Sequence, residues 1–182
     1  SPALVGIAQV VGDERALQQA LTVNPNDVKA LETYGQLALL NGRESDADEY
    51  FARALALNPE SLKSLSTLAA KAALEDRQDD LALYQQQVDG FSPNNPYFVG
   101  GLADSLGKNY LCTEAVAYAR ASIEADPEYW QGYTVLGGNL IRLGEEVEGK
   151  ANLEIGYEND PFNVMTSNML KVFDTLDTYA TL

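Results

Sequence analysis

The sequence predicts an all-α protein built as a right-handed solenoid of helical hairpins. Five of its seven prolines lie 34 residues apart, and each stretch between them holds two segments with apolar residues at helical spacing. A proline cannot continue a helix, and the residue before it favours extended backbone, so each proline marks a helix end. These prolines are Pro25, Pro59, Pro93, Pro127 and Pro161. A fixed period of this length is typical of stacked repeats.

Residues 28–61 form the clearest repeat. Two runs of apolar and small residues predict a first and a second helix, separated by a turn at Asn41-Gly42. The first run is Leu31, Tyr34, Gly35 and Ala38, and the second is Ala47, Phe51 and Ala54. Small residues at Gly35 and Ala47 would let the two helices approach closely, with Phe51 filling the space beside them.

The same offsets recur along the rest of the chain. Three further repeats are expected at residues 62–95, 96–129 and 130–163. Residues 1–27 are expected to hold a partial unit with one helix from Glu14 to Val23, and residues 164–182 a terminal first helix without its second. The sequence therefore predicts a single repeat domain that covers residues 1–182.

This size pattern resembles the tetratricopeptide repeat (TPR) family. The best copy carries Tyr34-Gly35, Gly42, Ala47, Phe51, Ala54 and Pro59. The chain departs from the family pattern at a few positions: Leu31 where Trp is often found, Leu81 and Gly149 at the usual Ala position, and Gln85 and Ala119 in place of the aromatic residue. The resemblance implies a TPR-like solenoid that acts as a scaffold for protein–protein interaction.

Composition excludes several classes of function. The chain has no histidine, which removes the commonest general base and metal ligand, and its single cysteine, Cys112, excludes an internal disulfide. Twelve Lys and Arg against 27 Asp and Glu give a net charge of −15, which disfavours nucleic acid and anionic lipid as partners. No apolar run is long enough to insert into a membrane.

Three sequence patterns come near a chemical site without forming one. Gly107-Lys108 lacks the spacing and the following Ser or Thr of a phosphate-binding loop. The acidic cluster of residues 44–49 continues into aromatic residues where a calcium loop needs oxygen ligands. Carboxylates at the start of a helix are more simply explained by the helix dipole. We therefore expect no catalytic residue, no metal and no cofactor in this chain.

The TPR resemblance also implies a concave groove lined mainly by the first helices. The groove positions that we select are Lys29, Glu32, Gln36, Lys63, Tyr97, Asp104, Lys108, Gln131 and Arg142. This set holds four basic residues but only two acidic ones, so we expect a neutral to mildly basic groove and acidic outer faces. The family's carboxylate clamp is absent, because Glu32 and Gln36 stand at the positions of its Lys and Asn. An ordinary solvated helix face is the alternative explanation of these polar residues.

The terminal helix is expected to be apolar on more than one side, through residues that include Met165, Met169 and Phe173. The segment from Asp160 to Val164 also resembles the junction between such repeats and a gluzincin-type metallopeptidase domain in bacterial proteins. That resemblance implies that the chain is the non-catalytic repeat portion of a larger peptidase, and that the terminal helix is covered by the next domain.

The expected function is therefore a non-catalytic scaffold that binds a protein, a peptide segment or a downstream domain of the same protein. The alternative is a self-associating scaffold, with a weak homodimer formed through the apolar terminal helix. Neither Lys nor Arg precedes Arg15, so no secretory n-region is recognised. A soluble protein in the cytoplasm or outside it is compatible with the sequence.

Overall fold

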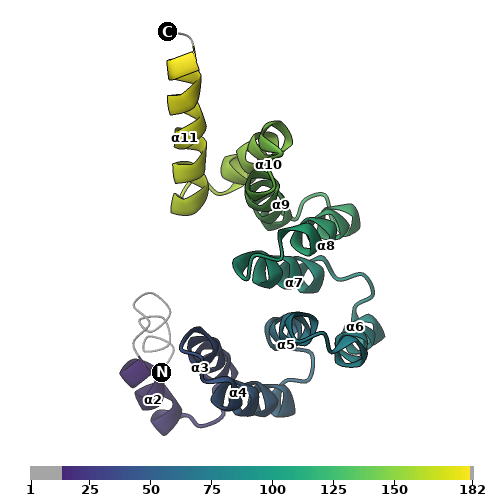
Figure 1. Cartoon of the computed structure of the whole chain (residues 1–182). Helices are drawn as coiled ribbons and strands as arrows, with labels where there is room; N and C mark the ends of the chain where they lie inside the picture. Colours follow the sequence, from purple (N-terminus) through teal and green to yellow (C-terminus); the bar gives the residue numbers. More distant parts are fainter. Residues whose placement is uncertain (1–13, 181–182) are drawn as a thin grey trace. The chain divides into compact units, whose positions relative to one another are not determined.

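The computed structural model describes residues 14–180, which form ten α-helices and no strand (Figure 1). The helices are α2 (Glu14–Val23), α3 (Val28–Leu40), α4 (Glu44–Leu57), α5 (Leu62–Leu74), α6 (Gln78–Phe91), α7 (Pro96–Lys108), α8 (Cys112–Ala125), α9 (Trp130–Arg142), α10 (Glu146–Asn159) and α11 (Val164–Ala180). Their starting residues repeat every 34 positions, as the proline spacing predicts. The predicted all-α helical solenoid is therefore confirmed.

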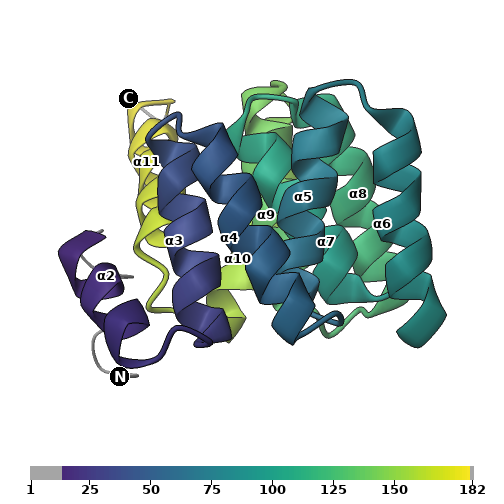
Figure 2. The ribbon, with the colours of Figure 1, turned by 90° about the horizontal axis from the view of Figure 1, so that it is seen from below.

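The chain divides into two compact units, and the division falls within α5. Unit 1 ends at Leu68 and contains the packed helices α2, α3 and α4; unit 2 begins at Ala69 and contains α7 to α11, each packed on the next. Figures 1 and 2 show α3 and α4 lying side by side in unit 1. A single domain over residues 1–182 stays a prediction.

Side-chain caps begin the first helices of the repeats. Four residues accept a hydrogen bond from the backbone N–H three positions further on: Asp27 from Ala30 (3.1 Å), Ser61 from Ser64 (3.2 Å), Asn95 from Phe98 (3.0 Å) and Asn163 from Thr166 (3.1 Å). Such caps satisfy one of the N–H groups that a helix start leaves without a partner. The fifth position of this series, Tyr129, makes no side-chain cap at the start of α9.

The turns inside the hairpins share a left-handed backbone residue. Its φ is 68° at Gly42, 55° at Asp76, 63° at Tyr110 and 88° at Gly144, and these positions are again 34 residues apart. A left-handed φ is easy for glycine and costs other residues about 1–2 kcal/mol. The geometry of the turn is therefore the same in all four hairpins even where the residue is unfavourable.

Small residues allow the two helices of a hairpin to pack closely. In unit 1 a Cβ at Gly35 would lie 2.9 Å from Cε2 of the fully buried Phe51, so the ring occupies the space that glycine leaves. In unit 2 a Cβ at Gly137 would lie 2.6 Å from the backbone oxygen of Gly149. No helix in the part of the chain that the structure describes is long and apolar enough to cross a membrane.

Candidate functional site

The first candidate surface lies in unit 1, where α3 meets the start of α5. Glu32 projects from α3 and is only 8% exposed. Its Oε1 accepts hydrogen bonds from the hydroxyls of Ser61 and of Ser64, the latter at 3.0 Å. Both serines are buried, and Ser61 is also the cap before α5. A carboxylate is costly to bury unless it is hydrogen-bonded, so these two serines make its burial tolerable.

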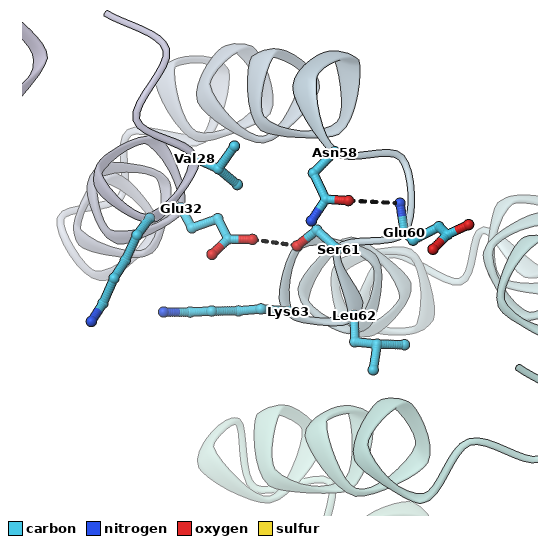
Figure 3. Close-up of a pocket in the computed structure, with 8 residues that line it drawn as sticks. Val28, Glu32, Asn58, Glu60, Ser61, Leu62 and Lys63 are labelled. Carbon is cyan, nitrogen blue, oxygen red and sulfur yellow. Dashed lines mark hydrogen bonds between the residues drawn. The ribbon is translucent and has the colours of Figure 1, made fainter. Parts of the chain in front are cut away.

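Glu32 borders a shallow cavity of about 510 Å³. The cavity is lined by Val28, Lys29, Glu32, Asn58, Glu60, Ser61, Leu62 and Lys63. Figure 3 shows Glu32 reaching from α3 toward Ser61, with Lys63 extended alongside it. The structure thus brings together three of the residues selected from the sequence, Lys29, Glu32 and Lys63. Gln36 lies one helical turn beyond Glu32 on α3 and is half-buried.

The second candidate surface lies in unit 2, on α7 and the loop before α9. Tyr97 is 57% exposed, and its ring centroid lies 5.0 Å from that of Tyr129 in an edge-to-face arrangement. Asp104, two turns along α7 from Tyr97, accepts an ion pair from Lys108 with Nζ to Oδ2 at 2.6 Å. Gln131, in the first turn of α9, is half-buried.

Arg142 is held at the carboxyl end of α7. Its Nη1 donates to the backbone oxygen of Gly107 at 2.8 Å and to Oδ1 of Asn139 at 3.3 Å, and its guanidinium lies 5.9 Å from the ring centroid of Tyr110. A cation is favourable there because the carbonyls at a helix end carry partial negative charge. Its charge therefore serves partly to close the ends of α7 and α9.

Burial is the main influence on the Tyr129 phenol. It raises the pKa of that group, and the negative charge of Asp104 raises it further, with a smaller contribution from Tyr97. A carboxylate acts in this way because it opposes the formation of a second negative charge nearby. Tyr129, Tyr97 and Asp104 are thus close enough to form one electrostatic group.

The selected residues of the terminal helix fall on different sides of α11. Met165 is 68% exposed, and Val164 and Val172 are exposed as well. Met169 is half-buried, with its Cε near Gly138 of α9, and Phe173 is half-buried, with the Lys150 ammonium 5.8 Å from its ring centroid. Met169 and Phe173 therefore face the preceding repeat, whereas Met165 faces outward.

Sequence reasoning missed Ser61, Ser64 and Tyr129. Ser61 had a detectable signal, because it stands 34 residues from the capping residues Asp27 and Asn95. Tyr129 occupies the same position of the period but is an aromatic residue, so no capping pattern marks it.

The described residues contain no group of three or more His, Cys, Asp or Glu side chains that could hold a metal ion. Their two cavities with listable linings are both shallow surfaces, one beside Glu32 and one beside Arg142. Hydrogen-bonding and charged groups on such surfaces can orient a bound peptide or protein segment.

Comparison with solved structures gives helical-repeat proteins of low sequence identity. Yeast Tom70 superposes with a TM-score of 0.70 and 18% identity over 96% of this chain and 39% of that chain. A TPR protein of Thermus thermophilus gives 0.67 and 17% over 93% and 95%, and Pseudomonas aeruginosa PilF gives 0.55 and 17% over 99% and 85%. The chain thus spans about two fifths of the Tom70 chain.

No protein-family model and no curated protein matches the sequence. The agreement in structure with TPR proteins nevertheless shows the class of fold that the helices define. The chain is a TPR-like helical-repeat solenoid.

Proposed function

We propose that this chain is a non-catalytic scaffold that binds a protein or peptide segment on the exposed faces of its first helices. The observation that carries the proposal is the cavity beside Glu32, where a carboxylate held by two serines and two lysines meet on one surface. A few convergent polar groups in a concavity are typical of a binding site. The TPR-like fold supports this assignment, because its repeats present extended concave surfaces for binding.

Selection from a random peptide library displayed on phage, with the whole chain as bait, tests this function. We expect enriched peptides whose affinity falls when Lys29 or Lys63 is changed to Glu. The control is Lys171→Glu, which reverses the charge of another exposed lysine, on α11. A chain that enriches no peptide, or that loses the same affinity in the Lys171 variant as in the Lys29 variant, contradicts the proposal.

A second proposal concerns the outer face of α11. We propose that the exposed residues Val164, Met165 and Val172 dock against a further domain of the parent protein, of the peptidase type that the junction segment resembles. Exposed apolar residues next to one another on a helix favour such a contact. A second copy of the chain is the alternative occupant of this face.

The two occupants are separated by light scattering on the chain and by limited proteolysis of the parent protein. Docking predicts a monomeric chain and a junction that is cleaved faster after Met165→Ser and Val172→Ser. Self-association predicts a dimer that the same variant dissociates. A monomer whose parent junction resists the protease equally in both forms contradicts both proposals.

A further inference from the structure

We propose that Tyr97, Tyr129 and Asp104 form a subsite in unit 2 for an arginine or lysine side chain of a partner protein. This inference rests on the proposed protein-binding function and adds the charge of the side chain that unit 2 accepts. It assigns a basic partner segment to a surface for which the sequence predicted a neutral to mildly basic character.

The aromatic pair supplies the first part of the argument. Tyr97 lies in the first turn of α7 with more than half of its surface exposed, and the edge-to-face contact with Tyr129 orients the two rings at 65°. The face of a tyrosine ring carries partial negative charge, so it attracts a guanidinium or an ammonium within about 6 Å of its centroid. Elsewhere in this chain the same contact occurs between Arg53 and Tyr50, at 5.4 Å.

Glycines hold the Tyr129 ring in place. A Cβ at Gly100 would overlap the Tyr129 ring, and one at Gly132 would lie 3.3 Å from its Cδ1. The ring thus packs directly on the backbone of α7 and α9, and it is more than half buried although its position in the period belongs to a capping residue. A ring fixed before binding loses less conformational entropy when a partner arrives.

Asp104 supplies the charge. It lies seven residues after Tyr97 on α7 and hence on the same helix face. Its partner Lys108 is well exposed, so this intrahelical pair contributes only about 0.3–0.5 kcal/mol and a partner's cation can replace the Lys108 ammonium. The other selected cation of this unit, Arg142, donates to Gly107 and Asn139.

The charge of unit 2 as a whole favours the same partner. From Ala69 to Leu182 the sequence has 7 Lys and Arg and 18 Asp and Glu, a net charge of −11. An acidic segment would be repelled by this field, whereas a basic one is attracted. The local geometry and the long-range charge therefore point to the same class of side chain.

Two tripeptides test the subsite: acetyl-Gly-Arg-Gly-amide and its citrulline analogue, which has nearly the same shape but no charge. Each is titrated into the whole chain at low salt, and the backbone amide signals are followed by NMR. We expect the arginine peptide to shift the signals of Tyr97, Gly100 and Gly101, and to bind about 5-fold more tightly than the citrulline peptide. Equal shifts from both peptides, or shifts confined to other residues, overturn the subsite.

Variants provide a test with effects of opposite sign. Tyr97→Leu and Asp104→Asn should each weaken arginine-peptide binding by about 2- to 5-fold, whereas Lys108→Gln should strengthen it because Asp104 then lacks its competitor. Tyr157→Leu and Glu154→Gln on α10 are the matched controls and should leave the affinity unchanged. Weaker binding in the Lys108 variant, or unchanged binding in the Tyr97 variant, overturns the proposal.

Failure of the subsite is distinguishable from failure of the scaffold function. Library peptides that bind the chain and owe nothing to a Lys or Arg residue, or that are acidic and lose affinity in the Tyr97 variant, overturn the subsite and leave the scaffold function standing. A library from which no peptide is enriched overturns the scaffold function itself.

Discussion

At the scale of single residues, Glu32 shows how a residue selected for binding also supports the fold. One carboxylate oxygen accepts hydrogen bonds from Ser61 and Ser64, and the three side chains are almost fully buried. Removing an acceptor from buried donors costs more than the net worth of the bonds, because the donors lose their partner without regaining water. The cavity beside Glu32 therefore depends on an internal bond network.

Replacement of Glu32 by Ala should lower the free energy of unfolding by about 1–3 kcal/mol. Glu32→Gln keeps an acceptor oxygen and should lose less. Urea unfolding followed by circular dichroism measures both. Glu44→Ala is the control, because Glu44 lies on the surface; it should change the stability by less than about 0.5 kcal/mol. Equal losses at Glu32 and Glu44 would contradict the role of the network.

The carboxylate of Glu14 offers a prediction on pH. A hydrogen bond from the Tyr34 hydroxyl, at 2.5 Å, and another from Arg43 lower the pKa of Glu14. A carboxylate whose pKa is lowered by folding stabilises the fold above its unfolded pKa, and this contribution disappears as the pH falls through the folded pKa. NMR titration should find the Glu14 pKa below the usual glutamate range. Tyr34→Phe should raise it and Tyr133→Phe should not.

At the scale of helices and turns, the sequence was informative wherever a residue type is demanded by local geometry. The 34-residue proline spacing placed every helix start, and Gly42 and Gly144 marked two of the left-handed turn positions. Asp76 and Tyr110 adopt the same φ without a glycine to mark them. These turns could be found only from the period, because packing of the hairpin imposes the backbone and overrides the preference of the residue.

Two glycines with open surroundings should respond in opposite ways to alanine. Neither Gly42 nor Gly90 has an atom within 4 Å of the position of a Cβ, but Gly42 has a φ of 68° and Gly90 lies within α6. Gly42→Ala should destabilise by about 1 kcal/mol, because alanine rarely adopts that backbone. Gly90→Ala should stabilise by about 0.5–1 kcal/mol, because alanine favours helix. Thermal unfolding of both variants decides; changes of the same sign would contradict the backbone argument.

Close packing between helices gives a second contrast. Gly35→Leu should cost about 1–3 kcal/mol, because its side chain must displace the buried Phe51 ring. Gly138→Ala should have a small effect, since its Cβ would make an ordinary contact of 3.9 Å with Met169. In the double variant Gly35→Leu and Phe51→Leu, part of the loss should be recovered. An unchanged melting temperature in the Gly35 variant would contradict the packing of this hairpin.

The candidate site was only partly accessible from the sequence. Lys29 and Lys63 follow the repeat period, so the pattern could place them on equivalent faces. The pairing of Tyr129 with Gly100 and Tyr97 depends on contacts between residues far apart in the sequence, which no periodicity specifies. Binding surfaces of this kind become visible only when the packing distances are known.

At the scale of the whole molecule, the dominant property is a net charge of −15. The field of such a chain extends about 10 Å into solution at moderate salt and steers the approach of charged partners. Long-range steering acts mainly on the association rate, whereas close contacts act mainly on the dissociation rate. The two effects can therefore be assigned to different residues of unit 2.

A basic partner should associate more slowly as the salt concentration rises, because salt screens the attraction. Changing the exposed residues Glu114, Glu124 and Glu154 to Gln lowers the net negative charge without touching the tyrosine surface, and should reduce the association rate alone. Tyr97→Leu removes a contact without changing any charge, and should increase the dissociation rate alone. Stopped-flow kinetics with an arginine-containing peptide taken from the library selection measures both rates. An association rate that rises with salt would identify an acidic partner instead, and equal effects of the two variants on both rates would show that charge and contact act at the same place.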